Sequence, residues 1–339
     1  MVEVINPLVI NPPTFIVAAG LAVTSYIFIL SYVTPVAVFL AIIPAITVFT
    51  LCYWVGFKNP STLSSRIWAF AIGAFVTVPI SLAISFIVDP WLERVGISTY
   101  AAAGIIEEAV KGGAILWLAR SWQLFDSVLR GLVYAILVAG GFAFTENILY
   151  FSQTSDLEGL IATFAVRGII LPFAHPIFTA TFGIAAGWIA GRKMYGRSSY
   201  ANSLILSLAY AIGSVGHGIW NLLSFFNSLW YTPAYIISLI FLLLIIERAQ
   251  RTESKLFETS VLNSGSALGE LERKILLDRS VRLSLKSVQT SYESKALNIW
   301  INIWRRTGAG ASLSDVINAA EPWYVLWYNH KLEINSNKI

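Results

Sequence analysis

One stretch of membrane-spanning length with three charges in its middle limits what this chain can fold into. Residues 101–120 read AAAGIIEEAVKGGAILWLAR and include Glu107, Glu108 and Lys111. An ionisable side chain at the centre of a membrane helix costs about 2.5–3.5 kcal/mol on insertion scales. On a helix Lys111 can neutralise either carboxylate, because it lies three or four residues away from each. A structural ion pair explains one glutamate and not two, so the stretch predicts one wall of an intramembrane active site.

The composition indicates a polytopic membrane protein. Of the 339 residues, 56% are hydrophobic and 12% are charged, whereas about a quarter of a soluble globule is charged. Apolar runs of spanning length occur at about 14–33, 35–56, 67–88, 99–119, 130–151, 164–191, 201–226 and 229–247. We therefore expect an all-α membrane helix bundle of about eight transmembrane helices over residues 1–248. The net charge of +4 does not indicate nucleic-acid binding, because its distribution among the loops carries the information.

The sixth apolar run differs from the others because it contains Arg167 and Pro172. Proline is a good first-turn residue of a helix. The run therefore predicts a short segment over 159–171, followed by a helix that begins near Pro172.

The loop charges predict the orientation. If the N-terminus is cytoplasmic and the spans alternate, the loops rich in Lys and Arg, 57–66, 120–130 and 192–200, all face inward. The loops 89–98 and 152–163, which carry more acidic residues, face outward. This is the distribution that the positive-inside rule describes. We expect a multi-pass protein of the plasma membrane with both termini in the cytoplasm.

Residues 249–339 have a different character. They contain no run of spanning length and are rich in Ser, Asn, Lys and Arg. Leu268, Leu271 and Ile275 have helical spacing. We expect a small, mainly helical cytoplasmic domain here.

Polar residues in three further spans complete the predicted site: Glu146 and Asn147 in the fifth, Arg167 and His175 in the sixth, and His217 and Asn221 in the seventh. With a rise of about 1.5 Å per residue, Glu107, Glu146, His175 and His217 all fall in the outer half of the bilayer. Four helices that place acids and imidazoles at overlapping depths predict a shared polar cavity.

These residue types favour activation of water over attack by a side-chain nucleophile. The chain has no Ser-His-Asp pattern, and Cys52 is its only thiol. A carboxylate among Glu107, Glu108 and Glu146 can act as general base, while a histidine polarises the substrate and Asn221 or a cation holds the oxyanion. Alternatively, His175, His217 and one carboxylate can ligate Zn²⁺ with an open position for water; we take Glu146 as that carboxylate. Both readings, Zn²⁺ or no metal, stay open.

The motifs that carry these residues resemble those of the PrsW family of intramembrane proteases, which is related to the CAAX prenyl endopeptidases. They are EEAVK (107–111), FAFTEN (142–147), Arg167 with PFAH (172–175), and HGIWN (217–221). They occur in this order within a motif core of residues 99–226, one to each span. The resemblance implies an integral-membrane endopeptidase of glutamic or metallo type. It also implies a membrane-anchored protein as substrate, such as an anti-sigma factor cut on the extracytoplasmic side.

Residue by residue, the resemblance implies that Glu107 and Glu108 are the paired catalytic glutamates, with Lys111 as their partner. His175 matches the intramembrane histidine, and His217 with Asn221 matches the HxxxN element. We expect Glu107, Glu108, Glu146, His175 and His217 to be catalytic, supported by Lys111, Asn147, Arg167 and Asn221. Glu146 stands where CAAX-type relatives place a histidine, which argues against a CAAX prenyl protease.

A CAAX-type prenyl protease stays a further alternative, and two functions of other classes remain beside it. Intramembrane Glu and His also suit the relay of a proton-coupled transporter or channel, although no repeat is visible in the sequence. A catalytically inactive scaffold that binds membrane segments is the other.

Overall fold

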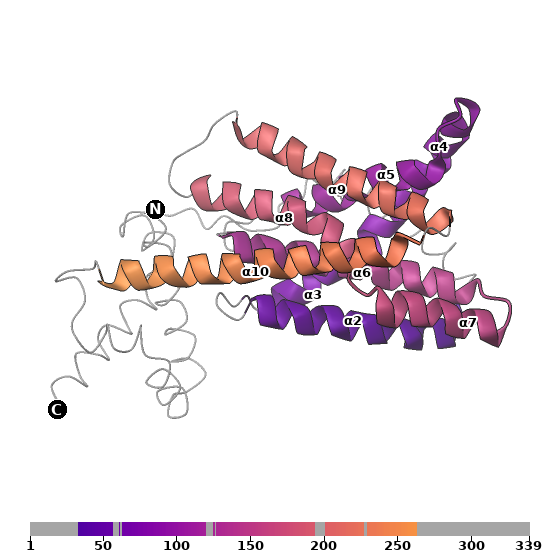
Figure 1. Cartoon of the computed structure of the whole chain (residues 1–339), viewed down its shortest axis with the longest axis horizontal. Helices are drawn as coiled ribbons and strands as arrows, with labels where there is room; N and C mark the ends of the chain where they lie inside the picture. The colour runs from indigo at the N-terminus through magenta and orange to yellow at the C-terminus, as the bar shows by residue number, and fades with distance from the viewer. Residues whose placement is uncertain are drawn as a thin grey trace, which may run out of the picture. The chain divides into compact units, whose positions relative to one another are not determined.

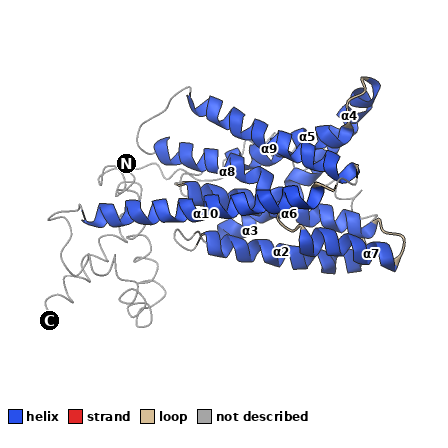
Figure 2. Cartoon of the chain, in the orientation of Figure 1, coloured by secondary structure: helices blue, strands red, loops and turns tan. Residues whose placement is uncertain are grey.

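The computed structural model describes residues 33–56, 61, 63–119, 125, 127–193, 201–226 and 229–262. Within these ranges the chain forms helices and no strand (Figure 2). The predicted span at 14–33 lies, except for Val33, outside the described residues, as does the predicted cytoplasmic domain beyond Leu262. The division into residues 1–248 and 249–339 therefore stays a prediction.

The helices follow one another along the chain as Figure 1 shows. Their bounds are α2 Pro35–Val55, α3 Leu63–Ile72, π-helical η1 Gly73–Thr77, α4 Val78–Arg94, α5 Thr99–Ala119, α6 Val128–Ser152, α7 Leu157–Phe164, π-helical η2 Ala165–Ile170, α8 Ala174–Lys193, α9 Ala201–Phe225 and α10 Tyr231–Leu262.

Six stretches in the described part of the chain are long and apolar enough to cross a membrane. They are Pro35–Val55, Leu63–Arg94, Val128–Ser152, Leu157–Ala190, Asn202–Phe225 and Tyr231–Lys255. Helix α5 has 21 residues, also enough to span, but carries the three charged residues noted above. The predicted polytopic all-α bundle is confirmed.

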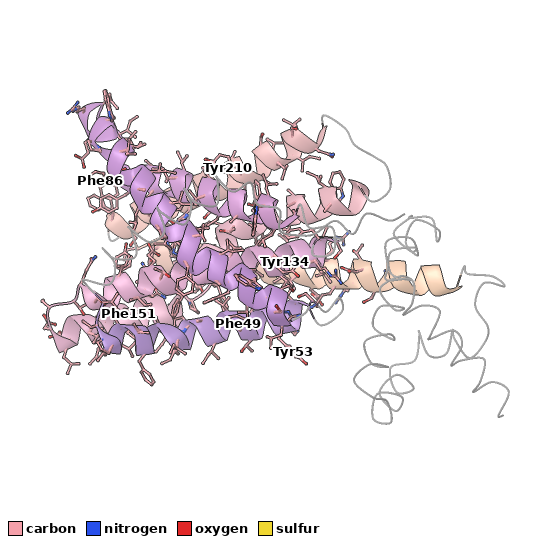
Figure 3. All side chains as sticks on the ribbon, turned by 180° about the vertical axis from the view of Figure 1, so that it is seen from behind. Phe49, Tyr53, Phe86, Tyr134, Phe151 and Tyr210 are labelled. Atoms are coloured by element: carbon pink, nitrogen blue, oxygen red, sulfur yellow. The ribbon has the colours of Figure 1, made fainter. Side chains whose placement is uncertain are left out.

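Large apolar side chains cover the outside of these helices, as lipid contact requires. Phe86 on α4 is 85% exposed and points away from the helices, whereas Tyr134 on α6 is completely buried (Figure 3). Apolar residues are thus found on both the inside and the outside, a distribution typical of a protein embedded in lipid.

Helix α6 forms the centre of the bundle. Every residue from Leu129 to Ala143 is buried, and α2, α3 and η1 pack against the helix. A Cβ atom at Gly131 would collide with the backbone carbonyl of Gly183 on α8, so glycine permits the close approach of these two helices.

The sixth apolar run is broken, as its sequence predicts. Leu171 leaves the helical conformation (φ −118°, ψ 35°), and α8 begins at Ala174. The cause is Pro172, whose ring disfavours the helical region for the residue before it. The break puts His175 in the first turn of α8, where its side chain faces α5 and α6.

Two helices are longer than the sequence predicts. The third run extends from Leu63 to Arg94 rather than over 67–88, and α10 continues past Glu247 to Leu262. Arg, Gln, Glu and Lys are good helix formers, so a helix continues where an apolar run stops. Among the described residues, those of 33–190 and 201–246 belong to one compact unit, and 191–193 and 247–262 belong to another.

Candidate active site

Helix α5 crosses α9 at two glycines, and this crossing positions the acidic residues. A Cβ atom at Gly104 would lie 2.5 Å from the backbone nitrogen of Gly218, so only glycine allows the contact. One turn further along α5, Glu108 faces His217 of α9. The small residues that flank the charges in the sequence therefore let a histidine from another helix reach them.

Lys111 lies at the centre of the cluster and its side chain is completely buried. Its Nζ donates to Glu108 Oε1 at 2.8 Å and to Glu107 Oε2 at 3.3 Å. The same ammonium lies 3.2 Å from His175 Nδ1 and 4.1 Å from the centre of the Phe142 ring. The lysine therefore neutralises part of the acidic charge and links α5 to α6 and α8.

Glu108 is held on both of its oxygens. Oε1 accepts from Lys111 and lies 3.1 Å from His217 Nδ1, while Oε2 accepts from the Thr179 hydroxyl at 2.8 Å. Its side chain is 3% exposed. A carboxylate so surrounded is fixed in orientation.

Glu146 has a similar relation to the other histidine. Its Oε2 lies 2.7 Å from His175 Nε2 and accepts from Arg167 Nη2 at 2.5 Å. Arg167 also donates from Nε to Asn147 Oδ1 at 2.9 Å, and its guanidinium lies 3.8 Å from the centre of the Tyr150 ring. The predicted supporting residues Asn147 and Arg167 thus anchor Glu146.

Both histidines turn their remaining nitrogen toward Glu107. His175 Nδ1 and His217 Nε2 each lie 3.7 Å from Glu107 Oε2. The two imidazole rings stand nearly perpendicular, at 84°, with centres 5.1 Å apart. Phe178 stacks on His217 with ring centres 5.0 Å apart, which limits rotation of that imidazole.

Glu107, His175 and His217 have the geometry of a metal-binding set. One ligand atom from each lies within 4.8 Å of the other two. Ligands of tetrahedral Zn²⁺ stand about 3.4 Å apart, given metal–ligand distances of about 2.0–2.1 Å. Two imidazole nitrogens and a carboxylate oxygen are also donors that Zn²⁺ commonly takes, so these residues fit the ion. The carboxylate in this set is Glu107, whereas our prediction had Glu146.

The structure brings together eight of the nine predicted site residues: Glu107, Glu108, Lys111, Glu146, Asn147, Arg167, His175 and His217. It places the ninth, Asn221, one turn further along α9. There its amide donates to the backbone carbonyl of Tyr100 at 3.1 Å. That contact joins α9 to the start of α5.

Sequence reasoning did not single out Thr179, Phe178 or Tyr150. A threonine or an aromatic residue is ordinary in an apolar helix and attracts no notice. For Thr179 one signal was available: it lies four residues after His175, on the same helical face.

Comparison with known proteins agrees with these motifs. The model of a family described as PrsW family intramembrane metalloprotease matches residues 61–246. "Protease PrsW" of Clostridioides difficile is 27% identical over 211 residues, which cover 60% of this chain and 85% of that protein. "Protease PrsW" of Oceanobacillus iheyensis is 29% identical over 185 residues, covering 53% and 80%. No solved structure matches the chain.

Proposed function

The chain belongs to the PrsW family of intramembrane metalloproteases, and from this premise we propose that Glu107, His175 and His217 form the reaction centre of its peptidase activity. The chain is thus an intramembrane endopeptidase. Neither a transporter nor a CAAX-type protease has support from these matches. The residue roles, the metal, the substrate and the side of cleavage are the parts that we propose.

The assignment rests on one observation. Three atoms with unshared electron pairs, one each from Glu107, His175 and His217, face one another. Lys111 can only donate, so His175 Nδ1 at 3.2 Å accepts, and His175 Nε2 then donates to Glu146. Because an ionised carboxylate can only accept, His217 donates from Nδ1 to Glu108 and keeps a lone pair on Nε2. Both lone pairs lie 3.7 Å from Glu107 Oε2. Such a group requires positive charge, which the Lys111 ammonium beside Glu107 and His175 supplies in part.

Zn²⁺ would be held by His175, His217 and Glu107, and when bound it would supply Lewis-acid activation of water and of the substrate carbonyl. Glu146 and Glu108 would then act as the carboxylates behind the two histidine ligands. Metal-binding histidines commonly donate their other N–H to such a carboxylate. The alternative is a glutamic mechanism without metal. The position of the Lys111 ammonium favours it, because that cation already lies beside Glu107 and His175.

In the glutamic mechanism, where Glu107 holds no metal, the geometry favours Glu107 over the adjacent Glu108 as the general base. Glu108 receives hydrogen bonds on both oxygens and is 3% exposed, so its lone pairs are occupied. Glu107 is 14% exposed and accepts from Lys111. A base must reach the water whose proton it takes, and Glu107 meets this requirement better.

Hydrolysis by this glutamic mechanism then needs two proton transfers at Glu107. As the water oxygen bonds to the carbonyl carbon of the substrate, its proton passes to Glu107. When the carbon–nitrogen bond breaks, the protonated Glu107 gives this proton to the departing amine. A positioned general base of this kind contributes about 10²–10⁴-fold to the rate.

We propose that the substrate is a membrane-anchored protein, such as an anti-sigma factor, cut near the extracytoplasmic side. The loop charges support this side, since they orient the chain so that the site residues lie in the outer half of the bilayer.

The test is cleavage of candidate single-span substrates in membranes that contain Glu107→Gln, Glu108→Gln, His175→Ala or His217→Ala. We expect each variant to lose most of the activity. Full cleavage by all four would contradict the assignment. Metal content and the effect of a chelator on the wild-type protein then separate the metal-dependent mechanism from the glutamic one.

A further inference from the structure

Thr179 makes a hydrogen bond that links α8 to the acidic helix. Its side chain is completely buried, and its hydroxyl donates to Glu108 Oε2 at 2.8 Å. It lies four residues after His175 on α8, so one helix provides both an imidazole and this hydroxyl to the site.

The contact determines what Glu108 can do with its other oxygen. With Oε2 occupied by Thr179, Oε1 remains for Lys111 and for Nδ1 of His217. A carboxylate that receives one donor on one oxygen and two on the other has a fixed rotation about its Cγ–Cδ bond. Loss of the Thr179 hydroxyl would leave Oε2 buried without this donor, which favours rotation toward another donor.

We propose that Thr179 is a positioning residue of the protease. It holds Glu108 so that His217 carries its proton on Nδ1 and points Nε2 at Glu107. Thr179 acts through Glu108 and His217 and does not touch the reacting atoms. The inference rests on the proposed function, because it assigns to His217 Nε2 a role in the reaction centre.

The alternative is an ordinary helix threonine whose only role is packing. Thr181, two residues further along α8, serves as the comparison. Its hydroxyl lies 2.9 Å from the backbone carbonyls of both Phe178 and Ala209 and can donate to either. Neither acceptor belongs to the acid and imidazole groups. Both hydroxyls thus donate hydrogen bonds, but Thr179 donates to the Glu108 carboxylate whereas Thr181 donates to backbone.

The experiment compares Thr179→Val, Thr179→Ser, Thr181→Val and Glu107→Gln with the wild type in proteoliposomes, using one single-span substrate. Valine keeps the shape of threonine and removes the hydroxyl, while serine keeps the hydroxyl. We expect Thr179→Val to lower kcat by about 10–100-fold, the usual effect of removing a group that orients a ligand or catalytic residue. KM should stay within about twofold, because substrate binding does not use this hydroxyl.

Serine should restore kcat to within about threefold of the wild type, since it supplies the same donor. Thr181→Val should leave both constants unchanged. Thermal unfolding of each purified variant is measured alongside; if Thr179→Val is not recovered folded, Thr179→Ala is put through the same comparison.

Three results would overturn the inference: full activity of the variant without the hydroxyl, a change in KM alone, or a serine variant as impaired as the valine variant. The Glu107→Gln variant distinguishes a failure of the inference about Thr179 from a failure of the proposed function. If Glu107→Gln is inactive and Thr179→Val fully active, Thr179 has no positioning role and the proposed function stands. If Glu107→Gln is itself fully active, the proposed function fails.

Discussion

Glu107 Oε2 lies 3.7 Å from His217 Nε2, although the two residues come from helices far apart in the chain. His175 Nδ1 lies at the same distance on another side of that oxygen. Glu107 is therefore the carboxylate that both histidines share, whereas Glu108 contacts His217 and Glu146 contacts His175.

The first prediction concerns the two adjacent glutamates. In the glutamic mechanism, Glu107→Gln should lower kcat by about 10²–10⁴-fold, because an amide cannot accept the proton of water. KM should change little. Steady-state cleavage in proteoliposomes measures both constants. Glu158→Gln makes the same chemical change at an exposed position of α7 and should leave them unaltered. An active Glu107→Gln protein would exclude Glu107 as the base.

The second prediction concerns metal. If the metal-dependent mechanism holds, purified protein should contain about one Zn²⁺ per chain. His217→Ala should lose it, because one of the two imidazole ligands is gone. Glu146→Gln should keep the ligands and weaken binding by about 10–100-fold. Elemental analysis and a chelator titration give these values. Activity that persists after complete removal of metal would favour the glutamic mechanism.

A third prediction concerns the anchor of Glu146. Arg167→Ala removes the donors to Glu146 and Asn147 and should lower kcat by about 10–100-fold. Arg167→Lys should restore only part of this loss, because an ammonium does not reproduce the planar fork of a guanidinium. Arg94 lies over the Trp91 ring at the end of α4 and provides the control. Equal activity of Arg167→Ala and Arg94→Ala would show that the anchor is dispensable.

A fourth prediction tests the crossing of α5 and α9. Gly104→Ala would bring a Cβ atom to 2.5 Å from backbone at Gly218 and should lower the free energy of unfolding by about 1–3 kcal/mol. Gly113→Ala on the same helix meets nothing within 4 Å and should be tolerated. Thermal unfolding in detergent compares the two. Similar midpoints for both variants would argue against a close crossing at Gly104.

The fifth prediction concerns orientation. Single cysteines in loop 89–98 should react with an impermeant thiol reagent added outside intact cells, and cysteines in loop 192–200 should react only after permeabilisation. The native Cys52 is buried and contributes little background. Labelling of the 192–200 loop from outside would reverse the assigned side of cleavage.

Most residues of the candidate site could be predicted because charges within apolar spans are costly and therefore conspicuous. Helix periodicity then places Glu107, Glu108 and Lys111 together. Which carboxylate the two histidines share could not be predicted, because it depends on side-chain rotamers and on how α5, α6, α8 and α9 cross. Asn221 illustrates this: it shares a helical face with His217, yet one turn of α9 takes it past the Gly104 crossing to the backbone of Tyr100.

The fold was predictable to a similar degree. Apolar runs locate membrane helices, and Pro172 marks the break in the sixth run. Helix ends were predicted less accurately. The polar residues that follow an apolar run, as in α10 after Glu247, continue the helix, but the hydropathy of the sequence does not reveal this.

The buried Lys111 has one further consequence, which concerns the charge of the whole cluster. Three carboxylates, Glu107, Glu108 and Glu146, face the cations Lys111 and Arg167. With both imidazoles neutral, the group carries one uncompensated negative charge in surroundings that oppose it. A single proton would bring it to neutrality, and a divalent ion would reverse its sign. Protons and metal ions therefore compete for the same negatively charged group, so the metal affinity of the protein should fall as the medium becomes more acidic.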